Sequence, residues 1–136
     1  MTEEASNRAR RTRSILSAQK QMQRIEERKL VELKRQAREL SETEANLVGL
    51  LEDPQSYTAL VPEVGVRRLS NVRKVIDRVA TNSRAQAERL IHQTGRSKLA
   101  ERVNADAESE VRQHHERREL EEAIERFLRA RTASLP

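Results

Sequence analysis

The sequence has no cysteine and no tryptophan, and it contains one tyrosine and one phenylalanine. Without cysteine, disulfide bonds and thiolate metal sites are excluded. With so few aromatic residues and a mean hydropathy of −0.88, the chain cannot bury a large globular core, so it is either disordered or an extended coiled coil. Its richness in Ala, Glu, Leu and Arg with helical periodicity favours the coiled coil.

Proline and glycine are also scarce, at three residues each. With so few glycines, phosphate-binding loops such as GxxxxGK[ST] are excluded, and no GxSxG nucleophile motif is present. Pro54 and Pro62 both fall in the segment 52–66, and Gly49 and Gly65 flank its centre. Because proline removes a backbone donor and glycine loosens a helix, we expect a turn in this segment.

The segments on either side of this turn are long, charged and free of proline up to the terminal Pro136. The sequence therefore predicts an all-α fold, a long two-helix antiparallel coiled-coil hairpin that forms one domain over residues 1–136. We expect helix one at about 3–51, the turn at 52–66 and helix two at about 67–131. The first thirteen residues are expected to be a frayed helix start, with a basic arm as the alternative.

Apolar residues in helix one recur at steps of three and four, which places them on one face. Met22 and Leu33 are eleven residues apart, and this spacing locally relaxes or reverses a supercoil. Ser41-Glu42-Thr43-Glu44 fits a capping box, but the stripe keeps its phase there, so we expect one continuous helix. The expected seam of helix one is Ile15, Ala18, Met22, Ile25, Leu30, Leu33, Ala37, Leu40, Leu47 and Leu51.

The apolar stripe of helix two is regular near the turn and poorer beyond Leu90. Gly95 lies within it and costs about 1 kcal/mol relative to alanine, which marks a soft point. The expected seam is Leu69, Val72, Ile76, Val79, Ser83, Leu90 and Thr94, then Ala100, Val103, Ala107, Val111 and His114.

Helix two is expected to be longer than helix one, so its C-terminal part extends past the start of helix one. This part carries apolar residues that have no intramolecular partner in the predicted hairpin. Because an exposed apolar stripe usually marks a binding surface, we expect a protein partner here. The candidate residues of this terminal overhang are Leu120, Ile124, Phe127 and Leu128.

The formal net charge is +5, with 27 basic and 22 acidic residues. Acidic residues interrupt most basic runs, and almost no aromatic residues are present to stack on bases, so nucleic-acid binding is not expected. Non-specific contact with phosphates stays open as an alternative. His115 and Glu119 have a spacing that suits metal chelation, but a surface pair is the expected role, and we expect no metal, no cofactor and no enzymatic activity.

No apolar run approaches the roughly 20 residues that cross a bilayer, and the N-terminus has no secretory h-region. We therefore expect a cytoplasmic protein that does not insert into a membrane and reaches the inner membrane only through partners.

The layout of the chain resembles the FliJ family of flagellar type III export proteins and the related YscO-type proteins of injectisomes. The resemblance lies in the basic N-terminus, the first helix up to Leu51, the break Glu52-Asp53-Pro54-Gln55-Ser56-Tyr57 and the run from Val66 to Val72. It implies a two-helix cytoplasmic stalk that inserts into a hexameric export ATPase ring, contacts the export gate and helps to cycle export chaperones.

The resemblance also implies two contact regions. The family's gate contact uses apolar and aromatic residues near the turn, and the ring contact uses the paired helix termini, here with the terminal overhang named above. Two alternatives stay open: a general coiled-coil adaptor or homodimeric scaffold, and a basic protein that binds nucleic acid non-specifically. The residues that match the gate contact are Leu47, Leu51, Tyr57, Leu69 and Ile76.

Overall fold

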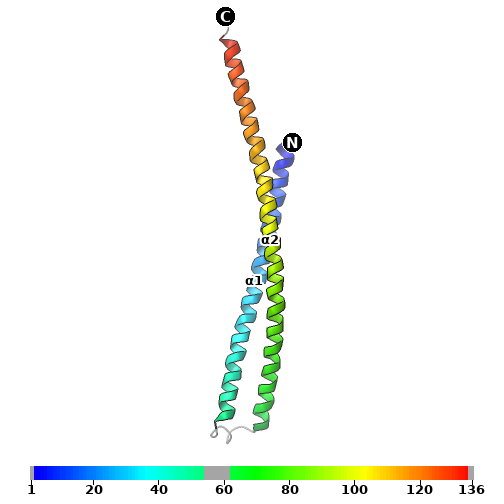
Figure 1. Cartoon of the computed structure of the whole chain (residues 1–136), viewed down its shortest axis with the longest axis vertical. Helices are drawn as coiled ribbons and strands as arrows, with labels where there is room; N and C mark the ends of the chain where they lie inside the picture. The colour runs from blue at the N-terminus through cyan, green and yellow to red at the C-terminus, as the bar shows by residue number, and fades with distance from the viewer. Residues whose placement is uncertain (1, 54–61, 135–136) are drawn as a thin grey trace. The chain divides into compact units, whose positions relative to one another are not determined.

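The structure, a computed structural model, describes residues 2–53 and 62–134. Within these ranges the chain forms two α-helices and no strand. Helix α1 (Thr2–Glu52) has 51 residues and α2 (Pro62–Ala133) has 72 (Figure 1). The two helices pack against each other, so the prediction of an all-α helical hairpin is confirmed.

Contacts within the chain group it into two units. Unit 1 combines residues 1–21 of the first half with residues 95–136, and unit 2 comprises residues 22–94. Each unit therefore contains one stretch of α1 and one stretch of α2.

The helix ends follow local chemistry. Glu3 and Glu4 lie in the first turn of α1, and Glu63 lies in the first turn of α2, where carboxylates stabilise exposed N–H groups. Helix α2 begins at Pro62, earlier than the expected start near Arg67. Proline suits the first helical position because its missing N–H would have no helical acceptor there. Pro54 lies outside the described residues.

Both helices continue through the positions where the sequence suggested interruptions. Helix α1 runs through Ser41–Glu44, and the Thr43 hydroxyl donates a hydrogen bond to the main-chain oxygen of Glu39 at 2.9 Å, within the helix. Helix α2 runs through Gly95 without a break. The prediction of a continuous first helix is therefore confirmed, and the soft point expected at Gly95 does not interrupt α2.

Unit 2 is an antiparallel helix pair. Glu44 lies 4.0 Å from Arg73, whereas Glu26, earlier in α1, accepts a hydrogen bond from Gln86, later in α2. Gln86 is 4% exposed, and its amide also donates to the main-chain oxygen of Glu26 at 3.0 Å. The seam buries Val79 and half-buries leucines from α1, so it is apolar near the turn and polar farther from it.

Unit 1 is also antiparallel, because Arg8 pairs with Glu110 and Lys20 pairs with Glu101. Its seam is made of small side chains, which let two helices approach closely but bury little apolar area. The Thr12 hydroxyl lies 3.0 Å from the main-chain oxygen of Ala9 and from the side-chain oxygen of Asn104, and it donates to one at a time. The buried residues of this seam are Ala5, Ala9, Thr12, Ser97, Ala100 and Ala107.

The first turns of α1 are therefore packed against α2, so the prediction of a frayed helix start is wrong. Ala5 and Ala9 are each only 5% exposed. A helix end that buries one face against a neighbour gains the tertiary contacts that an isolated end lacks.

The prediction of the helix-one seam is wrong in its first half. Ile15, Met22 and Ile25 are 45–55% exposed, and Ala18 is also exposed. The buried and half-buried positions keep steps of three and four along the whole helix, so the eleven-residue drift does not occur. On α2, Val103 is 39% exposed, whereas its neighbour Asn104 is half-buried. The seam positions that replace the predicted ones on α1 are Leu16, Gln19, Gln23 and Glu26.

Candidate protein-binding surfaces

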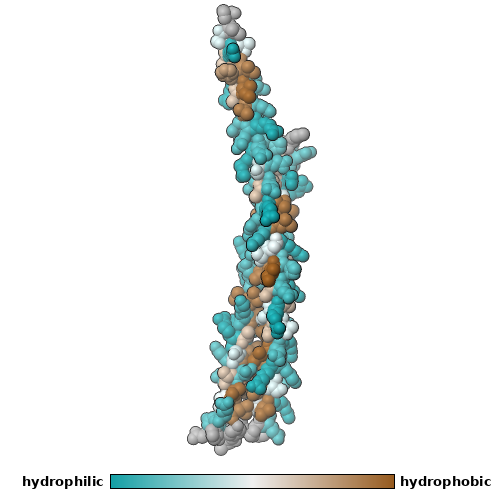
Figure 2. Space-filling view, in the orientation of Figure 1, coloured by the Kyte–Doolittle hydropathy of each residue, from teal (hydrophilic) through white to brown (hydrophobic). Residues whose placement is uncertain are grey.

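The last part of α2, residues 115–133, is called the end segment here. It belongs to unit 1, and it runs on beyond the N-terminus of α1 (Figure 1). Every described residue of this segment is exposed. Figure 2 shows a hydrophobic surface near its C-terminal end. The four residues predicted for the terminal overhang are all strongly exposed: Leu120 62%, Ile124 50%, Phe127 65% and Leu128 55%.

Charges within the end segment support its helix. His115 Nε2 lies 3.1 Å from a carboxylate oxygen of Glu119, and Arg129 lies 3.8 Å from Glu125. Both pairs are four residues apart, a spacing that brings side chains together on a helix. Arg131 in the last turn lies where a cation stabilises the exposed carbonyl groups. His115 and Glu119 thus form a surface pair, as the sequence predicts.

An apolar hollow of about 260 Å³ lies on one side of unit 1. Ile15 from α1 faces it, together with Leu99 and Val103 from α2, and these three side chains are 39–60% exposed. Sequence reasoning missed this surface because it assigned Ile15 and Val103 to the seam. The complete lining is Thr12, Ile15, Gln19, Arg96, Leu99, Ala100 and Val103.

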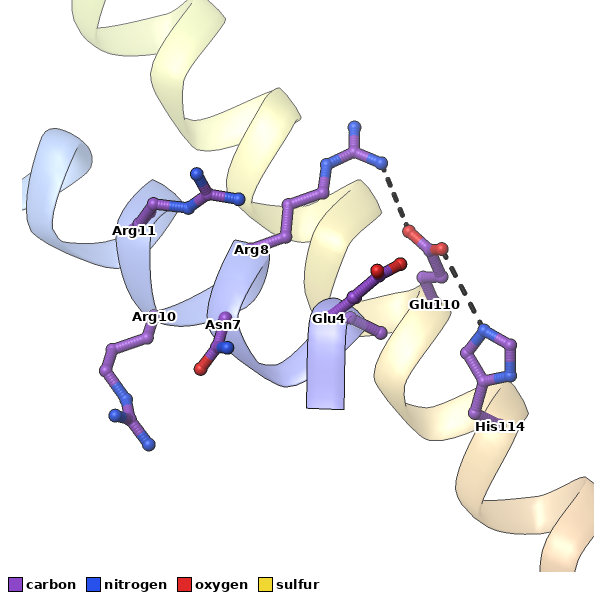
Figure 3. A pocket seen from close by; sticks show the side chains of 8 residues that line it. Glu4, Asn7, Arg8, Arg10, Arg11, Glu110 and His114 are labelled. Atoms are coloured by element: carbon purple, nitrogen blue, oxygen red, sulfur yellow. Dashed lines mark hydrogen bonds and ion pairs between the residues drawn. The ribbon is translucent and has the colours of Figure 1, made fainter. Parts of the chain in front are cut away.

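The N-terminal arginines lie beside an acidic part of α2. Arg8 Nη1 contacts Glu110 at 3.2 Å, and the other oxygen of Glu110 lies 3.9 Å from His114 (Figure 3). Arg10 points away from this pair (Figure 3). Arg13 contacts Glu108 at 3.1 Å. The alternative of a basic arm rests on Arg8, Arg10, Arg11 and Arg13. Of these, Arg8 and Arg13 pair with carboxylates within unit 1.

The turn-proximal residues predicted for a gate contact lie mostly in the seam of unit 2. Leu47, Leu51, Leu69 and Ile76 are half-buried, and Tyr57 lies outside the described residues. The apolar side chains that face outward near this end are different ones. They are Leu50, Val64 and Val66, each 46–58% exposed.

The charged face of unit 2 holds one cluster with shifted titration. Arg35 donates hydrogen bonds to Glu32, at 3.0 Å from Nε, and to Glu39. The hydrogen bond from Arg35 lowers the pKa of Glu32 below its usual value. Both side chains are about half exposed, so this cluster supports the helix locally and forms no enclosed site.

Over residues 2–53 and 62–134, no three acidic or histidine side chains come together as metal ligands. Within the same ranges, neither helix has a stretch apolar enough to pass through a lipid bilayer.

Comparison of the chain with protein-family models, with curated proteins and with solved structures gives no match.

Proposed function

We propose that the protein is a non-enzymatic coiled-coil adaptor that works by binding other protein chains along its helices. In its specific form it is a stalk of a flagellar or type III protein export apparatus, located in the cytoplasm. There it couples an export ATPase ring to the export gate and helps to cycle export chaperones. The specific form is supported by the resemblance to the FliJ family described above.

One observation carries the proposal: the end segment presents four large apolar side chains to solvent on a charged helix. Leu120 and Phe127 are more than 60% exposed. Monomeric proteins rarely keep such a continuous apolar stripe free, and stripes of this kind usually mark interaction sites. On a helix, residues 120, 124 and 127 share one face, which is the pattern of a helix that docks into a groove.

The turn-proximal contact is proposed with different residues from those of the resemblance. Leu47, Leu69 and Ile76 already pack in the seam, so they hold the hairpin together. Leu50 and Val66 are exposed and are better placed to meet a partner at this end.

Co-purification with the hexameric export ATPase of the same organism tests the export form of the proposal. Leu120→Asp and Phe127→Asp each place a charge in the apolar stripe, and we expect each to weaken binding at least tenfold. Arg129→Gln is the matched control, because it lowers the net charge by the same one unit on the opposite face of the helix. If all three variants bound the export ATPase as tightly as the original chain, the assigned contact would be refuted.

A further inference from the structure

Helix α2 carries a second apolar stripe that is separate from the hairpin seam. Leu99 and Val103 each directly precede a seam residue, and one residue along a helix turns the side chain by about 100°. This stripe therefore lies to one side of the seam. Its Glu110 still pairs with Arg8 of α1, and Leu99 and Val103 share the hollow with Ile15. In unit 1 it continues at steps of three and four, and it is called the outer stripe: Leu99, Val103, Asp106, Glu110, Gln113, Arg117, Leu120, Ile124 and Phe127.

The outer stripe is apolar at both ends and polar in the middle. Leu99 and Val103 form one apolar end, and Leu120, Ile124 and Phe127 form the other; all five are 39–65% exposed. The polar centre contains acidic residues first and a basic residue later along the chain. Two copies of this pattern that run in opposite directions therefore place apolar ends opposite each other and the acidic part opposite the basic residue.

We propose that two copies of this chain bind each other through the outer stripes of their α2 helices, which run antiparallel. In the pairing that fits, Leu99 of one copy lies opposite Ile124 of the other, and Val103 lies opposite Leu120. Because the pair is two-fold symmetric, each of these contacts occurs twice. The inference rests on the proposed function in one respect, that the end segment binds protein.

Charge supports the same alignment. With the apolar ends matched, Asp106 of one copy lies opposite Arg117 of the other, and Glu110 lies opposite Gln113, whose amide is a donor for the carboxylate. Asp106 and Arg117 are both exposed, and neither forms an ion pair with any residue in the described part of the chain. The dimer supplies that missing partner for both.

Other alignments are disfavoured. A shift by one heptad in one direction places Asp106 opposite Glu110, and a shift in the other direction places Asp106 opposite Ile124. A parallel pair in register places Asp106 against Asp106 and Arg117 against Arg117. Like charges or charges against apolar side chains oppose each of these arrangements, so the stripe specifies a single register.

The hollow of unit 1 is the binding site for the end segment of the second copy. Its apolar floor and the exposed Ile15, Leu99 and Val103 suit the apolar stripe of that segment. Arg96 also lines the hollow, and in the proposed register it lies opposite Phe127 of the other copy, where a guanidinium can rest on the ring. The dimer thus covers two exposed apolar surfaces at once.

Sedimentation equilibrium of the full chain over the micromolar range tests whether the pair forms. We expect the mass to rise with concentration to twice the 15.7 kDa of one chain. Asp106→Arg and Arg117→Asp each place like charges opposite one another twice per dimer, and we expect each to weaken association at least tenfold. The double variant restores opposite charges, and we expect its association to return to within about threefold of the original.

Disulfide trapping tests the register, since the natural chain has no cysteine. Val103→Cys combined with Leu120→Cys is expected to give a covalent dimer on oxidation. Within one chain these positions are about 25 Å apart along the helix, too far for a disulfide. Val103→Cys combined with Phe127→Cys reports the shifted register, and Val103→Cys by itself reports a parallel pair; we expect neither to cross-link efficiently.

The inference is overturned by a monomer at all concentrations, by a double charge variant that stays dissociated, or by cross-linking in either control. Circular dichroism of each variant checks that helix content is kept. If the original chain stays monomeric but binds the export ATPase, only this inference is refuted. A dimer that binds no export ATPase would instead refute the export form of the proposed function.

Discussion

A Cβ atom added to Gly65 would lie 2.6 Å from Cδ2 of Leu51, closer than real Cβ contacts come. Gly65 is buried at the start of α2, and Leu51 is half-buried at the end of α1. The glycine therefore allows the two helices to approach closely at the turn-proximal end of unit 2.

Replacing the three glycines with alanine separates this role from helix propensity. Gly49 and Gly95 have open space around the Cβ position, so Gly49→Ala and Gly95→Ala should each raise the free energy of unfolding by up to about 1 kcal/mol. Gly65→Ala should gain less or lose stability, because Leu51 must move. Thermal unfolding followed by circular dichroism measures the series, and Gly65→Ala as the most stabilising change would contradict the close approach.

The polar part of the seam contains one unsatisfied group. The side-chain oxygen of Gln23 is buried without a hydrogen-bond partner among the described residues. Gln23→Leu removes it, and we expect urea unfolding to show a gain of about 1 kcal/mol. Gln86→Leu is the matched comparison: it removes the donor to Glu26, so we expect a loss of about 1 kcal/mol. A gain in stability in both variants would mean that leucine stabilises the seam more than glutamine does, even where the glutamine is hydrogen-bonded.

Two adjacent residues of α1 test the register of the seam. Leu16 is half-buried and Ile15 is 55% exposed. Leu16→Ser should lower the free energy of unfolding by about 1–3 kcal/mol, whereas Ile15→Ser should change it by less than about 0.5 kcal/mol in dilute solution. Urea unfolding measures both effects. A larger loss for Ile15→Ser than for Leu16→Ser would mean that Ile15 lies in the seam, as the sequence predicts.

The ion pairs that join α1 to α2 in unit 1 should be weak and sensitive to salt. The Arg13–Glu108 side chains are 67% and 36% exposed, and Lys20–Glu101 is similarly open. Glu101→Gln and Glu108→Gln should each cost less than about 1 kcal/mol, and the cost should shrink in 1 M salt. Glu122→Gln in the end segment serves as the control. If the loss of stability is the same at low and at high salt, the replaced residue acts through packing and not through its charge.

Much of the fold follows from features that are local in the sequence. The scarcity of glycine and proline outside segment 52–66 predicts two long helices, and the longer second helix predicts the overhang that carries Leu120 and Phe127. Neither prediction depends on which faces of the two helices pack together. The start of α2 at Pro62 differs from the expected start near Arg67, because proline breaks a helix interior but suits the first helical turn.

The seam of unit 1 could not be predicted from hydrophobicity. Its buried positions hold Ala, Ser and Thr, whereas the larger apolar residues Ile15 and Val103 lie one step away on an outer face. Close helix approach favours small residues at the seam, and this preference outweighs the burial of large ones. The signal that could have revealed it is the unbroken seven-residue repeat from Ala5 through Thr12 to Gln19 and beyond.

Hydrogen exchange of the end segment tests the central claim most directly, because the claim is that the exposed apolar side chains of residues 115–133 form a protein-binding surface. In dilute solution we expect their amides to exchange rapidly, since an unsupported helix opens easily. With rising concentration we expect protection to appear there and around Leu99, while residues 62–90 stay unchanged. Strong protection of 115–133 at the lowest concentration, or none at any concentration up to high micromolar, would contradict the account.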